Sequence, residues 1–315
     1  MARPLFCACA LAALLTVPGA AQEPDSRPNF SSESELVVLH VAVKDNKGSY
    51  VGGLAQTAFR VSENARPQPI SFFNNQDAPV TVGLLIDSSG SMAASRDLVI
   101  AASLAFSKAM NRQDEFFVLG FNEDLHMPLP PDRPFTQSEP HLRVALVQAI
   151  KAVGRTALYN AVDAGLRHVQ KGEFERQVLV ILSDGGDNAS SVTRAGVLTR
   201  AQASNALIYT IALVDPMNQD ADPGFLSELS EATGGMAFRP KNVREVDSIL
   251  QRVARDIRSM YTIGYVPAQD LGSARRRKEE LRRVSVDVRS ATGQKLEVRT
   301  RRAYLANGEW NGDDR

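Results

Sequence analysis

Oxygen-bearing side chains gather at the end of one apolar segment of the chain. Residues 80–86 read Val-Thr-Val-Gly-Leu-Leu-Ile, a run typical of a buried strand, and Asp87, Ser89 and Ser91 follow it at alternate positions. Carboxylate and hydroxyl oxygens are ligands that hard divalent cations accept. The types and spacing of these three residues therefore predict part of a metal site.

Two later segments supply oxygen ligands of the same kind. Thr156 stands at the start of a helical pattern at 156–171, and Asp184 comes just after a second apolar run at 178–182. Ligands of open parallel sheets bind beyond the carboxyl ends of the strands, so Asp87 and Asp184 converge if their strands are neighbours. The predicted metal ligands are Asp87, Ser89, Ser91, Thr156 and Asp184.

This ligand set indicates which ion the site would hold. It contains no His or Cys, so Mg²⁺, Mn²⁺ or Ca²⁺ is expected rather than zinc. Because hydroxyls are neutral, the ion keeps more of its positive charge than it would among carboxylates alone. Mg²⁺ also usually retains waters in its coordination shell. An open position for the Asp or Glu carboxylate of a protein partner follows from this chemistry.

Each residue also has an ordinary structural interpretation. Asp87 could be a carboxylate at a helix start, Ser89 and Ser91 could be local caps, and Thr156 could be a helix N-cap. The three segments occur together, at two predicted strand ends and one predicted helix start, and this combination favours the metal site over the separate interpretations.

Further polar residues follow the same predicted strand ends. Asp187 and Asn188 are expected to be turn residues rather than supports of the site. Glu123 and Asp124 are candidates only because they follow a predicted strand end.

The elements that must position these residues follow from the hydrophobic periodicity. Strand-like runs occupy 80–86, 116–121, 178–182 and 207–214, and helical patterns occupy 95–111, 139–153, 156–171, 193–205 and 242–261. Such alternation, with fully apolar strands, predicts an α/β fold: a Rossmann-like, open, mainly parallel sheet with helices on both faces.

Both ends of the chain show a different pattern. Period-two alternation predicts strands at 36–43, 59–64, 70–73, 261–265, 284–288 and 296–300. The simplest arrangement joins these strands in one small all-β module, although two separate β units would produce the same pattern.

The three polar segments resemble the metal-ion-dependent adhesion site of von Willebrand factor A domains. Residues 87–91, 154–159 and 182–185 match its three parts in order, and the resemblance covers roughly residues 79–260. It implies that Asp87, Ser89 and Ser91 bind the metal directly or through water, that Thr156 adds a hydroxyl, and that Asp184 accepts hydrogen bonds from water or the serines. The flanking strands are similar to those of secreted bacterial proteins of this class, for which the family implies metal-dependent protein binding and adhesion rather than catalysis.

The predicted division of the chain has five parts. They are a signal peptide at 1–21, a flexible leader at 22–35, an N-terminal β segment at 36–78, the von Willebrand factor A domain at 79–262 and a C-terminal β segment at 263–315.

The N-terminus predicts export. Arg3 precedes an apolar stretch at 5–17, and small residues lead to a cleavage point near Ala21, as in a secretory signal peptide. A secreted or periplasmic protein is expected. Cys7 and Cys9 are the chain's two cysteines and lie in the piece that would be removed, so no disulfide is expected. No apolar run has the length of a membrane span.

The composition argues against nucleic acid as a partner. The 315 residues include 36 Lys and Arg and 36 Asp and Glu, so no overall field favours a polyanion. The basic run at 275–278 is followed by two glutamates and is interpreted as a solvated loop.

An enzyme that uses the same cluster, such as a metal-dependent hydrolase or phosphoesterase, is the alternative function. An aspartyl-phosphate enzyme usually has a carboxylate two residues after its nucleophile, where this chain has Ser89. The G-x-S-x-G elbow of serine hydrolases is absent around residues 87–91, and no Gly-rich phosphate loop follows a strand. Binding is therefore preferred, and a structural module with a degenerate metal site is the remaining alternative.

Overall fold

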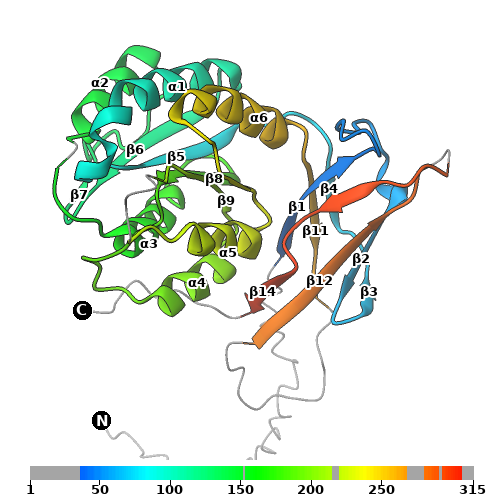
Figure 1. Ribbon diagram of the computed structural model, residues 1–315. Coiled ribbons are helices and arrows are strands. Elements are labelled where there is room, and N and C mark those ends of the chain that lie inside the picture. The colour runs from blue at the N-terminus through cyan, green and yellow to red at the C-terminus, as the bar shows by residue number, and fades with distance from the viewer. Residues whose placement is uncertain (1–35, 152, 215–219, 268–279, 291–292, 307–315) are drawn as a thin grey trace, which may run out of the picture. The chain divides into compact units, whose positions relative to one another are not determined.

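A mainly parallel sheet forms the centre of the larger part of the fold. The computed structural model describes residues 36–151, 153–214, 220–267, 280–290 and 293–306 (Figure 1). The sheet has the strand order β10-β9-β8-β5-β6-β7, and only β7 runs antiparallel to its neighbour. Its strands are β5 (Val80–Asp87), β6 (Glu115–Phe121), β7 (Leu125–His126), β8 (Arg176–Ser183), β9 (Leu207–Ala212) and β10 (Ala237–Phe238).

Helices cover both faces of this sheet, as predicted (Figure 1). One face carries α1 (Arg96–Ala109), α2 (Glu139–Ala149) and α6 (Val246–Arg258). The other carries α3 (Leu158–Val169), α4 (Arg194–Ala203) and α5 (Pro223–Thr233). Short 3₁₀ helices are η1 (Gln56–Ala58), η2 (Gly90–Ser95) and η3 (Val243–Glu245). Within the described part of the chain, no helix has the length and apolar character of a membrane span.

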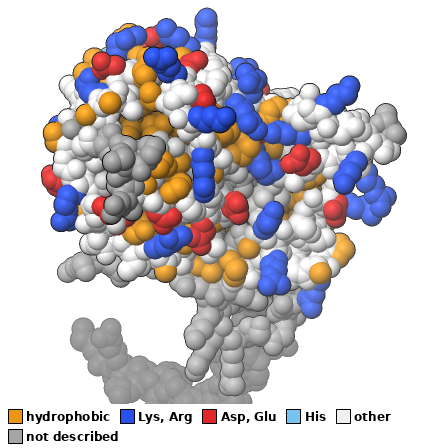
Figure 2. All heavy atoms as spheres, viewed as in Figure 1, with side chains coloured by type: hydrophobic (Ala, Val, Ile, Leu, Met, Phe, Trp, Pro, Cys, Tyr) orange, Lys and Arg blue, Asp and Glu red, His pale blue; other side chains and the backbone are white. Residues whose placement is uncertain are grey.

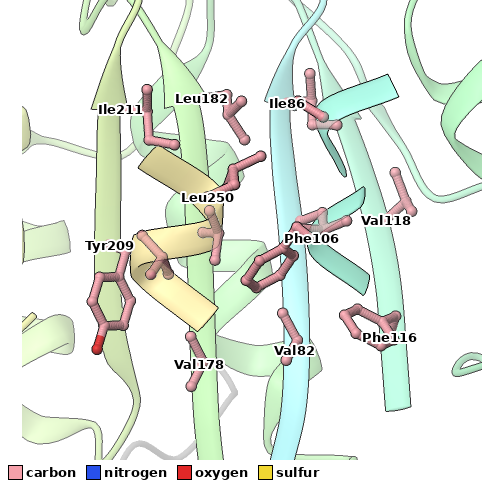
Figure 3. Packing of buried hydrophobic residues seen from close by; sticks show 14 of the residues in the cluster. Val82, Ile86, Phe106, Phe116, Val118, Val178, Leu182, Tyr209, Ile211 and Leu250 are labelled. Carbon is pink, nitrogen blue, oxygen red and sulfur yellow. The ribbon is translucent and has the colours of Figure 1, made fainter. Parts of the chain in front are cut away.

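Alternate side chains of the central strands enter two separate cores. Val82 and Ile86 of β5 belong to a cluster with Phe106 of α1 and Leu250 of α6 (Figure 3), whereas Leu85 joins the cluster beneath α3, α4 and α5. Successive strand residues point to opposite faces, so a strand covered on both sides must be apolar throughout. The continuous apolar runs in the sequence have this cause.

The strand order reverses at β5, which creates a switch point in the sheet. β6 follows β5 on one side, and β8 pairs with β5 on the other, with Ile86 opposite Leu182. Open α/β sheets bind ligands outside the carboxyl ends of the strands at such a point.

The remaining strands form a β sandwich. Its two sheets have the orders β13-β1-β11-β4 and β14-β12-β2-β3. The strands are β1 (Val37–Lys44), β2 (Phe59–Glu63), β3 (Arg66–Gln68), β4 (Phe72–Asn74), β11 (Tyr261–Tyr265), β12 (Glu280–Val288), β13 (Glu297–Arg299) and β14 (Ala303–Ala306). β1 pairs with β11 and β13, β2 pairs with β12, and the two sheets share one apolar core. The prediction of one module from both ends of the chain is confirmed.

Helix α5 is absent from the sequence prediction, although its boundaries carry ordinary signals. Asp222 is the N-cap and accepts from the Phe225 backbone N–H at 2.9 Å, and Gly234 ends the helix with φ of 83°. Small polar residues inside the helix lower its intrinsic propensity. One of them, Thr233, accepts a hydrogen bond from the Ile208 backbone N–H of β9 at 3.0 Å, so a tertiary contact compensates.

Charge is mixed over the molecular surface in view. Figure 2 shows Lys and Arg side chains interspersed with Asp and Glu, in keeping with their equal numbers in the sequence. The predicted signal peptide and leader lie outside the described residues.

Candidate metal centre

Asp87 ends β5 and is fully buried. Its Oδ1 accepts from the Ser89 backbone N–H at 2.9 Å, and its Oδ2 accepts from the Ser183 hydroxyl at 2.8 Å. Burial raises the pKa of the Asp87 carboxyl, hydrogen bonds from Ser89 and Ser183 oppose this shift, and the negative charge of Asp184 adds to it. A cation at this position would offset both the burial and the repulsion.

Asp184 comes from the neighbouring strand, as the sequence predicts for a converging pair. It directly follows β8, is buried, and accepts from the Gly186 backbone N–H through Oδ1 at 2.9 Å. Because β8 pairs with β5, Asp184 reaches the carboxyl end of the strand that carries Asp87. Ser183, which binds Asp87, was not among the predicted ligands.

Ser89 and Ser91 lie in the turn after β5. Ser89 occupies the N-cap position of η2 but makes no capping hydrogen bond with its side chain, which instead hydrogen-bonds to Asp87. The alternative of a local cap is therefore wrong for Ser89. Ser91 lies within η2, and its side chain is outside the described part of the structure.

Thr156 is not the N-cap of the following helix. Helix α3 begins at Leu158, and its N-cap position is Ala157. Thr156 is buried, and its hydrogen bonds to other described residues are made by its backbone N–H and carbonyl rather than its hydroxyl. The N-cap alternative is wrong, and the hydroxyl is available to a ligand.

The start of α3 is held by the loop that follows Asp184. The Thr156 backbone N–H donates to Asn188 Oδ1 at 3.0 Å, and the Asn188 backbone N–H donates to the Thr156 carbonyl at 2.9 Å. Asp187 Oδ1 accepts from the Tyr159 backbone N–H at 3.1 Å, an orphan donor of the helix start. The expectation that Asp187 and Asn188 are only turn residues is corrected, because both support the Thr156 loop.

Glu123 lies against the same loop from the other side. Its Oε2 accepts from the Arg155 backbone N–H at 2.6 Å. Gly154 has φ of 87°, a conformation that favours glycine, and a Cβ there would also displace the Glu123 carboxylate. Asp124 is exposed and forms a turn with Asn122. Sequence spacing could not place these loops, because their contacts join separate β-strand ends.

The donor set fits an oxygen-preferring divalent cation. It combines two buried carboxylates with hydroxyl groups, as Mg²⁺ or Mn²⁺ coordination allows. Among the residues that the structure describes, no group of three or more His, Cys, Asp or Glu side chains could hold a metal. Metal binding here would therefore depend on the hydroxyls.

Comparisons with known proteins agree with this fold. The family model of the von Willebrand factor type A domain matches residues 82–252. The chain is similar to a von Willebrand factor type A structure from Catenulispora acidiphila, with 16% identity and a TM-score of 0.49 over 87% of this chain and 75% of that chain. No curated protein shows a significant match.

Two further solved structures are similar over about half of the chain. An aerotolerance-related membrane protein from Bacteroides fragilis has 16% identity and a TM-score of 0.44, over 56% of this chain and 98% of that chain. Proximal thread matrix protein 1 from the mussel byssus, with a zinc-occupied MIDAS motif, has 12% identity and a TM-score of 0.44, over 57% of this chain and 48% of that chain.

Proposed function

Because this chain belongs to the von Willebrand factor type A domain family, we propose that it is a divalent-cation-dependent protein-binding module. The cation, Mg²⁺ or alternatively Mn²⁺ or Ca²⁺, takes an Asp or Glu side chain of a protein partner. Its proposed ligands are Asp87, Ser89, Ser91, Thr156 and Asp184.

One observation carries this proposal. Asp87 is buried at the switch point of the sheet, where Asp184 raises the pKa of its carboxyl in addition to the larger effect of burial. Two buried carboxylates so close together destabilise a protein unless something positive compensates them. A divalent cation with an open coordination position supplies that compensation and a point of attachment for a third carboxylate.

The surrounding residues position the proposed ligands. Ser183 and the Ser89 backbone N–H hold both oxygens of Asp87, which leaves its remaining lone pairs for a cation. Asn188 fixes the backbone on both sides of the Thr156 side chain. The site is thus organised by hydrogen bonds that already exist without the partner, which lowers the entropic cost of binding.

A hydrolase that uses the same cluster lacks support from the histidines, the usual general bases. His40 lies in β1 of the sandwich, and His168 packs against Phe117 and Phe135 with ring centroids 4.5 and 5.1 Å away. His126 and His141 make no hydrogen bond to a proposed ligand within the described residues. We therefore assign binding and not catalysis to this site.

We further propose that the protein is exported to the periplasm or secreted, like the bacterial von Willebrand factor A-related class. The proposal rests on the signal-like pattern of residues 1–21 and on the pairing of N- and C-terminal strands around the family domain.

Calorimetric titration of the chelator-treated protein with Mg²⁺, Mn²⁺ and Ca²⁺ tests the site. We expect saturable binding of one ion, which Asp87→Ala abolishes. Thr156→Ala should weaken binding without loss of stability, because no described residue depends on its hydroxyl. Asp124→Ala, an exposed carboxylate on a neighbouring loop, is the matched control and should bind like wild type.

Two outcomes would contradict the proposal. The first is the absence of binding to the wild-type protein. The second is equal binding by wild type, Asp87→Ala and Thr156→Ala, which would place the ion elsewhere.

A further inference from the structure

A cavity lies at the amino end of β8, whereas the candidate metal centre lies beyond its carboxyl end. The volume of this cavity is about 190 Å³. It is lined by Arg176, the first residue of β8, and by residues of the β sandwich that include His40 of β1, Thr262 of β11 and Phe72 of β4. The cavity thus lies where the central sheet meets the sandwich, apart from the proposed metal ligands.

Two buried nitrogen atoms of the lining residues lack an acceptor. His40 is 5% exposed and Arg176 is 4% exposed, and His40 Nε2 and Arg176 Nε have no hydrogen-bond partner among the described residues. The other guanidinium nitrogens of Arg176 donate to oxygens that carry only partial charge, among them the Ile257 carbonyl at 3.1 Å and Thr262 Oγ1 at 2.8 Å. Buried donors without an acceptor destabilise a protein, and a buried charge is stabilised by an opposite one.

The hydrogen bonds of Thr262 indicate which nitrogen of His40 carries the proton. Thr262 Oγ1 accepts from Arg176 at 2.8 Å and lies 3.4 Å from His40 Nδ1. Because an arginine N–H can only donate, the hydroxyl proton of Thr262 is left to donate to Nδ1. In the neutral imidazole this arrangement places the ring proton on Nε2. Both unpartnered nitrogens are therefore donors, which suit a ligand with two acceptor oxygens.

The solvent side of the cavity carries the opposite charge. Glu173 and Glu175 line the cavity and are exposed, whereas Arg176 is buried. A simple anion would be attracted by the guanidinium and repelled by these two carboxylates. Phe72 and Val38 add apolar surface to the lining. The cavity therefore complements a molecule that has a carboxylate at one end, an ammonium group at the other and a short aliphatic side chain.

We propose that this cavity binds a small aliphatic amino acid as its zwitterion. The carboxylate accepts from His40 Nε2 and Arg176 Nε. The ammonium group lies near Glu173 and Glu175. The volume limits the ligand to a small molecule, since pockets for drug-sized ligands measure about 300–1,000 Å³. This site goes beyond the proposed metal-dependent function and does not depend on it.

Three matched probes separate the two charges of the ligand. L-Alanine carries both charges, propionate carries only the carboxylate, and L-alaninamide carries only the ammonium group. Each is titrated into the chelator-treated protein, so that no cation at the candidate metal centre can take the carboxylate, and amide chemical shifts report binding. We expect alanine to bind roughly three- to tenfold tighter than propionate, as contact with two exposed carboxylates allows. Alaninamide should not bind detectably.

Variants of the lining residues assign the two contacts. Glu173→Gln combined with Glu175→Gln removes the negative charge of the rim and should abolish the preference for alanine over propionate. Glu231→Gln is the matched control, an exposed glutamate on α5, and should keep the preference. His40→Leu removes one donor to the carboxylate and should weaken the binding of alanine and propionate alike, by about tenfold or more. Thermal unfolding checks that each variant is folded.

Asp87→Ala, which lacks a proposed metal ligand, should bind alanine like wild type. Loss of alanine binding in this variant would place the ligand at the metal centre and overturn the inference. Three other results would overturn it as well: no binding of alanine to wild type, equal affinity of wild type for alanine and propionate, or a preference that survives the double glutamine substitution. None of these three results bears on metal-dependent binding of a protein partner.

Discussion

Thr156 shows how one side chain is placed by residues far from it in the sequence. Its backbone is held by Asn188, 32 positions away, and the helix that it precedes is completed by Asp187. Neither partner has an unusual residue type for a loop. Their importance follows only from the contact between two loops that leave different strands.

We predict that Asn188→Ala weakens Mg²⁺ binding by about tenfold, because supporting residues of metal ligands typically contribute that much to affinity. Asn188→Asp keeps the oxygen that accepts from the Thr156 backbone N–H but loses the donation from Asn188 Nδ2 to Asp220 Oδ2, so it should restore part of the affinity. Calorimetric titration measures both, and thermal unfolding of the metal-free proteins is the control. Equal affinity of Asn188→Ala and wild type would show that Thr156 needs no such support.

His40 is a second residue whose behaviour depends on its surroundings. It is buried in β1, its Nε2 has no hydrogen-bond partner among the described residues, and Arg176 and Arg301 lie nearby. Burial, followed by the charges of Arg176 and Arg301, lowers the pKa of His40 to about 3. His40 lines a cavity of about 190 Å³ together with Glu173 and Glu175.

This lowered pKa predicts acid destabilisation. Below a pH of about 6.5, His40 becomes protonated in the unfolded chain, whereas in the folded protein it stays neutral down to about pH 3. The free energy of unfolding therefore falls by about 1.4 kcal/mol for each pH unit by which the pH is lowered within this window. Above about pH 6.5 the residue is neutral in both states and contributes no pH dependence.

Urea unfolding of wild type and His40→Gln at pH 7 and pH 5 isolates this effect. The comparison between the two proteins is needed because burial raises the pKa of Asp114 to about 6, which acts in the opposite direction over the same range. We expect wild type to lose more stability than His40→Gln between the two pH values. Parallel losses would mean that His40 is protonated in the folded protein.

At the scale of elements, helix α6 is anchored by buried polar contacts to several distant segments. Asp256, fully buried in this helix, accepts from Tyr209 of β9 at 2.6 Å, from Tyr50 and from Arg299 of β13. The last turn is held by Arg176, which donates to the Ile257 carbonyl at 3.1 Å. The helix thus connects the central sheet to the β sandwich.

We predict that Arg299→Ala destabilises the protein by about 3 kcal/mol, since removal of one partner leaves the Asp256 carboxylate buried without its cation. Arg302→Ala, an exposed arginine nearby, should change stability by less than about 0.5 kcal/mol. The free energy of unfolding from denaturant titration measures both changes. A similar small effect for the two variants would mean that Tyr50 and Tyr209 alone suffice for Asp256.

At the scale of the whole molecule, residues outside the region that the family model matches hold the matched domain in place. The matched region ends at residue 252, yet Arg299 binds Asp256 and the Gly234 carbonyl, and buried Arg301 donates to the Ser204 carbonyl. The sandwich that supplies these arginines needs β1 and β2 from the other end of the chain. The two parts of the chain that flank the domain are therefore structural partners of each other and of the domain.

Hydrophobic periodicity is a local property of the sequence, and it was sufficient to predict most of the helices and strands of this protein. Continuous apolar runs identified β5 and β8 as strands buried on both faces, and placed Asp87 and Asp184 at their carboxyl ends. The same reasoning predicted helices on both faces of the sheet. It failed for α5, whose small polar residues are compensated by contacts with β9, and for β3, β7 and β14, which are too short to show a period.

Pairing between distant segments depends on long-range contacts that no local pattern contains. The tertiary structure made β5 and β8 neighbours, which brings Ser183 and Asp184 to Asp87. It also joined β1 to β11, which decided between one β module and two. The residue types of the candidate site can thus be read along the chain, whereas its supports, such as Asn188, follow from the way separate strand ends and loops come together in the folded protein.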